Sequence, residues 1–314
     1  MEHQSVLCAK SVELLQIDAE GIYVDATLGR GGHTIEIASR LTSGHLYAFD
    51  KDAQAILETG ERLKPYRDRI TVLHADFRQM KQSLEACGVH HVDGVMMDLG
   101  VSSPQFDDPS RGFSYRFDAR LDMRMNRESS PDAWQIVNTF EQEELTRILR
   151  EYGEERFAAS IARAIVTARA KKTIDTTFEL TDVIRTALPA VVLNGKGHPA
   201  RKTFQALRIA VNQELDALRE GLTEACSLLN VNGRCAVITF HSLEDRIVKT
   251  YFKTLASAPY VEPKLPIPSS RIATPSYRLI TPKPITADAR EIERNHRAHS
   301  AKLRVIERRK GETI

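Results

Sequence analysis

The sequence predicts an α/β fold in which a parallel sheet is interrupted by a helical insert. In the first hundred residues, short apolar segments alternate with helical stretches, which is typical of βαβ units. After Phe106 this alternation stops for about a hundred residues, and apolar side chains recur at helical spacing instead. A buried strand pattern returns at Cys235–Thr239. We therefore expect a sheet domain formed by residues 1–106 and 214–314, with a helical, substrate-recognising insert over residues 107–213.

The composition is that of an ordinary globular protein. The chain has 314 residues, of which 42% are hydrophobic and 27% charged, so it has room for two such units. Its formal net charge of +2 excludes a general attraction to nucleic acids or anionic membranes, so any basic site must be local. The absence of a long apolar run and of a secretory signal pattern in Met1–Glu20 predicts a cytoplasmic protein without membrane contact. The four cysteines are scattered and form no Cys-x-x-Cys pair, so we expect no disulfide and no metal site.

The first predicted strand leads directly into a glycine-rich loop. The strand Gly21–Ala26 is followed by the loop Thr27–Thr34 and then by a helical stretch, Ile35–Leu41. The loop contains three glycines, Gly29, Gly31 and Gly32. Glycines let the backbone approach a ligand closely, and a helix N-terminus behind them favours a negative group. The alternative is a tight turn without a ligand.

Acidic residues stand at the ends of successive predicted strands. The second strand, His45–Phe49, ends at Asp50, which lies 21 residues beyond Gly29. An acid at about this distance commonly binds a ribose diol in nucleotide-binding βαβ units. Two further strands are expected over residues 70–74 and 92–97. Each of the four predicted strands thus ends in an acid or is closely followed by one, and these acids are Asp25, Asp50, Asp76 and Asp98. Because ligands lie across the carboxyl ends of parallel strands, we expect these acids to line one crevice, although any single one of them is typical of a helix cap or turn.

The acids distinguish between two adenosyl cofactors. NAD and S-adenosylmethionine both carry a ribose for Asp50. The pyrophosphate of NAD would be repelled by Asp25 and Asp98, whereas carboxylates stabilise the sulfonium and ammonium groups of S-adenosylmethionine. The sequence therefore favours S-adenosyl-L-methionine as the cofactor.

The segment Ser103–Phe106 is similar to the (Asp/Asn/Ser)-Pro-Pro-(Tyr/Phe) loop of methyltransferases that modify exocyclic amines of bases. Such amines are poor nucleophiles, because their lone pair is delocalised into the ring. A stiff loop with a polar acceptor and an aromatic face can orient the amine, and stacking contributes about 1–3 kcal/mol. We expect the catalytic residues to be Asp98, Ser103, Pro104 and Phe106. The alternative is a surface Ser-Pro turn with Phe106 in the core.

Periodicity predicts the remaining elements. Helices are expected over Phe157–Ala168 and, as one long element ended by Asn232-Gly233, over Phe204–Leu229. Thr176 and Glu179 have the spacing of a capping box. A long proline-rich loop is expected over residues 259–284 and a final edge strand over 302–307.

Basic residues gather in two regions. Val183–Gln213 has no acid and contains five basic residues, Arg185, Lys196, Arg201, Lys202 and Arg208. Lys264–Ile314 holds twelve basic and five acidic residues, a balance of 12 − 5 = +7. A solvated basic face is the ordinary explanation for such regions, but beside a base-modifying site they predict RNA binding.

Seven strings resemble the MraW family of bacterial ribosomal RNA small-subunit methyltransferases: Asp25–His33, Asp98–Gln105, Arg111–Ser114, Leu121–Met125, Tyr152–Phe157, Thr203–Ile209 and Phe240–Arg246. The resemblance implies a class I S-adenosylmethionine-dependent methyltransferase fold with a Rossmann-like sheet. It implies methylation of the N4 amine of one cytidine in the decoding region of 16S ribosomal RNA. Cofactor contacts are expected from Gly31, Gly32, His33, Asp50, Phe77, Asp98 and Gln105. Substrate contacts are expected from Asp122, Arg124, His198, Arg201, Lys202 and His241.

Departures from the family pattern concern the substrate surface. Residues 198–202 and His299 differ from the usual family strings, but the surface that they form stays polar and mostly basic. The expected partner is 16S ribosomal RNA or the small ribosomal subunit, and the chain is expected to be a monomer or homodimer. Two other functions stay open: a methyltransferase of amines in DNA or protein, and a non-catalytic assembly factor that binds ribosomal RNA.

Overall fold

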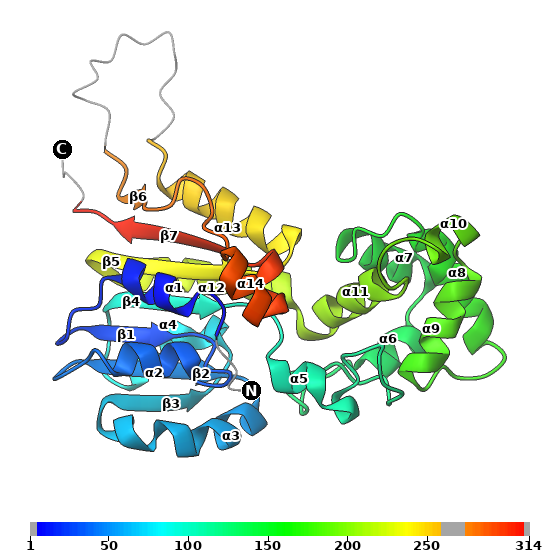
Figure 1. Cartoon of the computed structure of the whole chain (residues 1–314), viewed down its shortest axis with the longest axis horizontal. Helices are drawn as coiled ribbons and strands as arrows, with labels where there is room; N and C mark the ends of the chain where they lie inside the picture. Colours follow the sequence, from blue (N-terminus) through cyan, green and yellow to red (C-terminus); the bar gives the residue numbers. More distant parts are fainter. Residues whose placement is uncertain (1–4, 259–273, 311–314) are drawn as a thin grey trace, which may run out of the picture. The chain divides into compact units, whose positions relative to one another are not determined.

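The computed structural model describes residues 5–258 and 274–310 (Figure 1). The chain divides into two compact units, Met1–Gly100 with Leu215–Ile314 and, between them in sequence, Val101–Glu214. We call them the sheet unit and the insert unit. The expected domain boundaries, after residues 106 and 213, lie within six residues of these. Among the described residues, no helix has the length and apolar character needed to cross a membrane.

The sheet unit contains a seven-stranded sheet in the order β3-β2-β1-β4-β5-β7-β6. Its strands are β1 (Ile22–Asp25), β2 (His45–Asp50), β3 (Ile70–His74), β4 (Val92–Asp98), β5 (Leu229–Thr239), β6 (Tyr277–Leu279) and β7 (Lys302–Arg308). Strands β1 to β5 are parallel, and β7 runs antiparallel to both β5 and β6. The predicted α/β class and the first four predicted strands are confirmed.

Helices cover both faces of this sheet. They are α1 (Cys8–Leu15), α2 (Gly32–Ala38), α3 (Ala53–Leu63), α4 (Met80–Ala86), α12 (Glu214–Leu228), α13 (Ser242–Leu255) and α14 (Ala289–Arg294). Because neighbouring residues of a strand face opposite sides, Met96 joins the apolar cluster with α1 and α2, whereas Val95 and Met97 join the cluster with α4, α12 and α13. Short 3-10 turns complete the described chain: η1 (Lys64–Arg69), η2 (Phe77–Gln79), η3 (Pro109–Arg111) and η5 (His296–Ser300).

The insert unit is helical, as predicted. Its helices are α5 (Ser103–Asp107), α6 (Ala133–Thr139), α7 (Gln142–Glu151), α8 (Ala158–Arg169), α9 (Thr177–Thr186), α10 (Ala190–Leu193) and α11 (Arg201–Asn212). The capping box of α9 is confirmed, since Thr176 Oγ1 accepts the backbone N–H of Glu179 and Glu179 Oε2 accepts that of Thr176, both at 3.3 Å. The helices enclose their own apolar core, which includes Leu149, Ile161 and Leu207.

The single long helix predicted over Phe204–Leu229 is wrong. Gln213 adopts a left-handed backbone conformation, φ +50°, which ends α11 before α12 begins. Asn232-Gly233 does not end a helix either; it lies inside β5, where Asn232 has φ +68° and the register with β4 shifts. The apolar spacing of α11 continues into α12, so periodicity did not reveal the break at Gln213.

Two predictions near the C-terminus also need correction. The strand expected at the sheet edge over 302–307 is β7, which is paired on both sides and has a nearly continuous buried stretch. The edge is β6, which lies within the segment predicted to be a loop over 259–284. Residues 259–273 of that segment lie outside the described residues.

Candidate active site

The glycine loop packs tightly against its surroundings. Gly31 has φ +74°, and a Cβ added there would lie 2.6 Å from Thr59 Cγ2. A Cβ on Gly32 would lie 1.9 Å from Ser5 Oγ. Gly29, with φ +49°, has only a backbone oxygen near its Cβ position, at 3.8 Å. Packing within the protein therefore excludes a side chain at Gly31 and Gly32, whereas the space beside Gly29 is free of close protein atoms.

Asp25 is fully buried at the end of β1. Its carboxylate accepts hydrogen bonds from Thr34 Oγ1 at 2.6 Å and from the Thr27 backbone N–H at 3.1 Å. Burial raises the pKa of Asp25 to about 6, although these hydrogen bonds oppose the shift. Asp25 thus organises the loop from below and adds negative charge beneath it.

Asp98 ends β4 beside this loop. Its backbone N–H donates to Thr27 Oγ1 at 2.7 Å, and its Oδ2 lies 3.5 Å from His33 Nδ1. Its Oδ1 is buried and has no hydrogen-bond partner among the described residues. Burial, with the nearby carboxylates of Asp25 and Glu244, raises the pKa of Asp98 well above its usual range. An acceptor atom at this position is therefore available to a ligand.

His33 is buried and uncharged. Burial lowers its pKa to about 4, so the neutral imidazole predominates at physiological pH. His33 consequently does not neutralise Asp98, although its ring lies next to that carboxylate.

Glu244 brings a further buried carboxylate to the end of β5. Its Oε2 accepts the backbone N–H groups of Phe240 and His241, at 2.8 and 3.2 Å. The His241 Nε2 atom lies 3.1 Å from Glu244 Oε1 without forming a hydrogen bond, so the imidazole expected to contact substrate lies against this carboxylate at the start of α13.

Asp50 holds the glycine loop in register with β2. Its Oδ2 accepts the Gly29 N–H at 2.8 Å, and its Oδ1 accepts the Asp52 N–H at 2.9 Å. Burial raises the pKa of Asp50. Each carboxylate oxygen still has an unused lone pair, so the position expected to bind a ribose can accept further hydrogen bonds.

Asp76 does not share this arrangement. Its Oδ1 accepts the Arg78 N–H at 3.0 Å, which caps η2. Its Oδ2 forms ion pairs with Arg78, at 3.2 Å, and with Lys51, at 3.8 Å. Asp76 thus has the cap role that is the alternative for any single acid of the set, and it also pairs with two basic side chains.

Phe77, the residue expected beside the adenine, packs against Gly221 of α12. A Cβ on Gly221 would lie 2.4 Å from Phe77 Cδ2 and 3.4 Å from Met97 Cε. The ring is partly buried against the apolar cluster below α4 and α12. Gly221 therefore leaves the space that this ring occupies.

These groups fit a cationic adenosyl cofactor better than an anionic one. Asp25, Asp98 and Glu244 place three buried carboxylates close enough to raise the pKa of Asp98, and the neutral His33 does not offset them. A sulfonium or ammonium group would relieve this repulsion, whereas a pyrophosphate would increase it. The unpartnered Asp98 Oδ1 is the atom that would meet such a cation.

The segment expected to orient the amine is helical rather than a loop. Pro104 lies in the first turn of α5, where its missing N–H costs no hydrogen bond. Gln105 is buried, and its Oε1 accepts the Ser102 N–H at 3.0 Å. Phe106 meets Phe113 edge-on, with ring centroids 6.3 Å apart. The side chains of Ser103 and Pro104 lie outside the described part of the structure.

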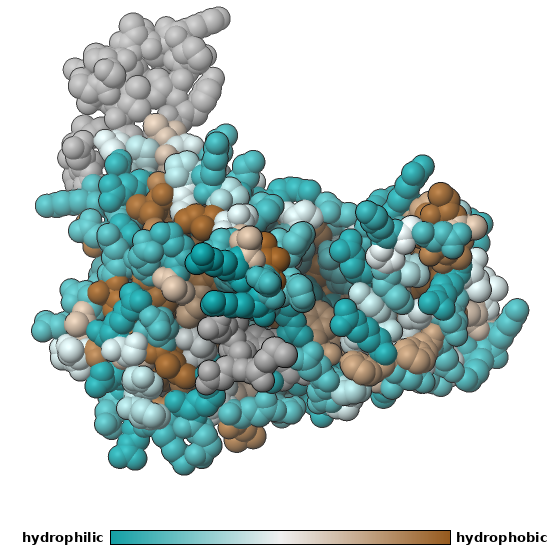
Figure 2. Space-filling view, in the orientation of Figure 1, coloured by the Kyte–Doolittle hydropathy of each residue, from teal (hydrophilic) through white to brown (hydrophobic). Residues whose placement is uncertain are grey.

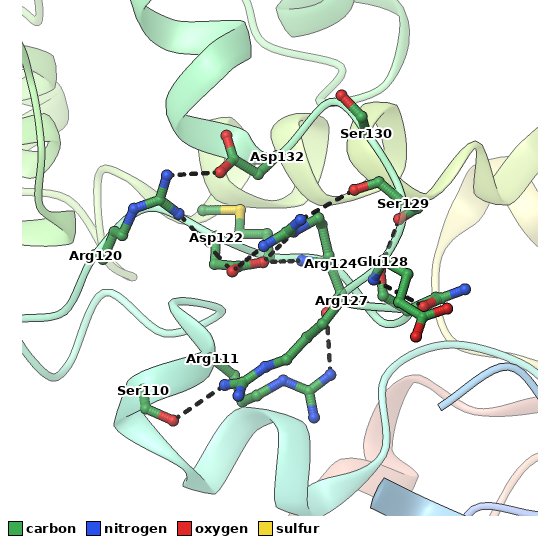
Figure 3. Close-up of polar contacts among 12 residues, drawn as sticks. Ser110, Arg111, Arg120, Asp122, Arg124, Arg127, Glu128, Ser129, Ser130 and Asp132 are labelled. Carbon is green, nitrogen blue, oxygen red and sulfur yellow. Dashed lines mark hydrogen bonds and ion pairs between the residues drawn. The ribbon is translucent and has the colours of Figure 1, made fainter. Parts of the chain in front are cut away.

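Asp122 and Arg124, expected to contact substrate, bind each other in the insert unit. Figure 3 shows Asp122 between two arginines, and Arg124 Nε and Nη2 donate to its two oxygens at 2.9 and 2.8 Å. Arg124 Nη1 also donates to the Ser129 carbonyl at 3.0 Å. Although burial opposes the shift, Arg124 lowers the pKa of Asp122. Arg120 joins the network by pairing with Asp132, the cap of α6, at 2.7 Å.

Of the other substrate residues expected in the insert unit, one has a local structural contact and two lie at the surface. Lys202 Nζ donates to the Glu154 carbonyl at 2.8 Å, which gives it a local structural contact. Arg201 is exposed. His198 stacks on Tyr115 with ring centroids 4.1 Å apart and an interplanar angle of 5°. The insert unit thus keeps Arg201 and His198 at its surface.

Comparison with known proteins gives the family. The profile of the MraW methylase family matches residues 1–309 of the chain. The chain belongs to the MraW methylase family. Three relatives bear the name ribosomal RNA small subunit methyltransferase H. The protein of Limosilactobacillus fermentum is 53% identical over 98% of both chains. That of Oenococcus oeni is 51% identical over 98% of both, and that of Exiguobacterium sibiricum is 50% identical over 98% of this chain and 99% of its own.

Membership of the MraW family confirms the class I methyltransferase fold and S-adenosyl-L-methionine as the cofactor. Three supporting residues of this MraW site were not expected from the sequence: Thr27, Gly221 and Glu244. Gly221 had a detectable signal, because a glycine inside a helical pattern is unfavourable without a packing reason. Glu244 had the spacing of a capping partner to His241. Thr27 carried no such signal, since its role depends on the neighbouring strand.

Proposed function

We propose that this chain transfers the methyl group of S-adenosyl-L-methionine to the N4 amine of a cytidine in the decoding region of 16S ribosomal RNA. Membership of the MraW family and the names of its relatives support methylation of small-subunit ribosomal RNA. The observation that carries the chemistry is the buried, unpartnered Oδ1 atom of Asp98 at the end of β4. A ribosomal substrate also implies a cytoplasmic location.

The cofactor, when bound, supplies an electrophilic methyl carbon on a sulfonium sulfur. Asp50 and Phe77 would hold its adenosyl end, with Gly31, Gly32 and His33 along the loop. Asp98 and Gln105 would hold the methionine end. Asp25 contributes charge from beneath the loop, because its carboxylate is fully buried and bound to Thr34.

Asp98 would also receive the proton that the substrate amine loses. Its pKa is raised by burial, Asp25 and Glu244, which brings its proton affinity closer to that needed at neutral pH. The hydrogen bond from its backbone N–H to Thr27 fixes the end of β4 on which it stands. General-base assistance of this kind is worth roughly 10²- to 10⁴-fold in rate, while positioning of the reactants contributes the larger share.

Ser103, Pro104 and Phe106 would orient the cytosine. The proposal gives Ser103 the role of polar acceptor for the amine, Pro104 that of stiffening the backbone, and Phe106 that of an aromatic face. It rests on the likeness of this segment to the motif of amine methyltransferases and on the placement of Pro104 in the first turn of α5.

The test supplies labelled S-adenosylmethionine with small ribosomal subunits, protein-free 16S ribosomal RNA, DNA or total protein, and then maps the label. We expect label in the RNA on an exocyclic cytosine nitrogen. Label in DNA or protein would favour the alternative amine methyltransferase, and label on a carbon or a 2′-oxygen would contradict the proposed chemistry. RNA binding without label transfer would indicate an assembly factor.

A further inference from the structure

Two phenyl rings are exposed on the insert unit. Phe117 is 46% exposed and Phe178 is 44% exposed, whereas Phe113 and Phe204 of the same unit are buried. Burying a phenyl side chain is favourable, so a partner that covers both rings would gain binding free energy from them. Figure 2 shows hydrophobic residues at the surface over α9 among hydrophilic ones.

Hydrogen bonds join the two segments that carry these rings. Thr177 Oγ1 donates to the Phe117 carbonyl at 2.6 Å, and the Phe178 N–H donates to Asp118 Oδ1 at 3.3 Å. The Thr177 N–H donates to the Ala119 carbonyl at 2.9 Å. The segment that carries Phe117 is thereby fixed to the first turn of α9, so the exposure of both rings belongs to the folded unit.

A stacked pair of flat rings includes Tyr115, which stands two residues before Phe117. Tyr115 stacks on His198, and the Tyr115 ring is itself held edge-on by Phe204, with centroids 5.6 Å apart. Burial and the nearby Arg185 and Arg116 lower the pKa of His198. The imidazole is therefore neutral, and two arginines lie close to it.

The charge of this surface is predominantly positive. Arg116, Arg185, Lys196 and Arg201 are exposed, and none of them forms an ion pair with another described residue. Arg185 lies seven residues after Phe178 on α9, which puts both on one face of the helix. The exposed acids Asp118 and Asp182 lie nearby, and Asp118 accepts the Phe178 N–H. Glu179, the residue after Phe178, pairs with Lys172.

Aromatic rings interleaved with arginines are the recognition chemistry of unpaired nucleic acid. Exposed bases stack on aromatic rings while arginines meet the phosphates, whereas a double helix hides the faces of its bases. An apolar protein surface would gain little from the neighbouring unpaired arginines. The observations therefore favour a single-stranded RNA over a protein partner.

We propose that Tyr115, Arg116, Phe117, Phe178, Arg185 and His198 form a stacking surface for unpaired nucleotides of ribosomal RNA. We call these six residues the aromatic surface. It deepens the proposed function, on which it rests, by naming where the insert unit holds RNA outside the methylated nucleotide. Lys202 and Arg208 are not part of it, because Lys202 contacts the Glu154 carbonyl and Arg208 pairs with Glu214 at 2.7 Å.

The test compares the wild-type chain with the double variant F117A/F178A. The affinity for protein-free 16S ribosomal RNA, the affinity for S-adenosylmethionine, and kcat and KM for small subunits are measured. Loss of one stacked base weakens RNA binding roughly 5- to 150-fold. We expect RNA affinity to fall at least about tenfold, KM to rise with little change in kcat, and cofactor affinity to stay within about twofold.

Three further variants make the result specific. F117Y/F178Y keeps the rings and should restore RNA affinity. V191A removes another exposed apolar side chain, on α10, and should leave RNA affinity unchanged. R116Q/R185Q should weaken binding less at high salt than at low salt, because it removes phosphate contacts. The midpoint of urea unfolding is compared for all variants, and F117A and F178A singly replace the double variant if it does not fold.

Several outcomes would overturn the aromatic surface. The first is an unchanged RNA affinity in F117A/F178A, and the second is a failure of F117Y/F178Y to restore that affinity. The third is weaker binding to small subunits without weaker binding to protein-free RNA, which would indicate a ribosomal protein as the partner. A wild-type chain that binds the RNA but does not methylate it would refute the proposed function, while the binding comparison would still decide this inference. A wild-type chain that does not bind the RNA would refute both.

Discussion

A Cβ on Gly221 would lie 2.4 Å from Cδ2 of Phe77, although 144 residues separate the two in sequence. Gly221 lies in α12 and Phe77 follows β3, so the close approach depends on how α12 packs on the sheet unit. The ring occupies the space that any larger residue at position 221 would need. Phe77 is also the residue expected beside the adenine of the cofactor.

Gly221→Ala should therefore weaken cofactor binding through Phe77. We expect the Kd for S-adenosylmethionine to rise at least about tenfold, because the ring must move away from its position. The matched control is Gly60→Ala in α3, where nothing lies within 4 Å of the added Cβ. This control should keep cofactor affinity and gain about 0.5–1 kcal/mol of stability, since alanine favours helix more than glycine does. Equal cofactor affinity in both variants would show that Phe77 does not contact the adenosyl group.

Asp98→Asn should greatly reduce turnover. The amide cannot accept a proton as a carboxylate does, so we expect kcat to fall by about 10²- to 10⁴-fold in transfer of label to ribosomal RNA. Asp76→Asn provides the comparison at another strand end, because Asp76 caps η2 and pairs with Arg78 and Lys51. It should lose about 1 kcal/mol of stability and retain kcat within a few fold. Full activity of Asp98→Asn would remove this residue from the proposed mechanism.

Asp25 should give the stability of the cofactor-free protein a measurable pH dependence. Burial raises its pKa from 3.8 to about 6, so the folded state binds more protons than the unfolded state between these values. The contribution of Asp25 to the free energy of unfolding is fully present below pH 3.8 and is lost as pH rises through about 6. The total loss is roughly 3 kcal/mol. His33, whose pKa is lowered from 6.5 to about 4, contributes in the opposite sense over nearly the same range.

Asp25→Asn isolates the first of these contributions. As pH rises from about 4 to 7, the free energy of unfolding of this variant should increase relative to that of the wild type, because only the wild type loses the Asp25 contribution. Urea unfolding at several pH values measures the difference between the two curves, in which the His33 contribution cancels. Parallel curves would contradict the shift attributed to Asp25.

Arg124→Ala tests whether the Asp122–Arg124 pair supports the fold or the substrate. The change removes three side-chain hydrogen bonds of Arg124. The Asp122 carboxylate, which is 13% exposed, keeps the backbone N–H of residue 124, at 3.0 Å, and the more distant Arg120. We expect the free energy of unfolding to fall by about 1–3 kcal/mol. A rise in KM for small subunits without a loss of stability would instead assign Arg124 to substrate contact, as expected from the family strings.

Much of the sheet unit was predictable because its signals are local. The strands ending at Asp25, Asp50 and Asp98 carry short apolar runs, and parallel pairing brings their carboxyl ends to one edge whatever the remaining contacts are. The break at Gln213 was not predictable, because the apolar spacing of α11 continues into α12. Packing decides it: Leu207 belongs to the core of the insert unit and Leu218 to that of the sheet unit.

The sequence by itself determined the α/β class, the glycine loop and the acids at the strand ends, since all three follow from residue type and period over short distances. Tertiary structure alone decided what each acid does. Asp76 is neutralised by Arg78 and Lys51, whereas Asp98 has a free oxygen and lies near Asp25 and Glu244. The pKa of a buried carboxylate depends on burial and on charges brought close by folding, and the spacing of residues along the chain does not contain that information.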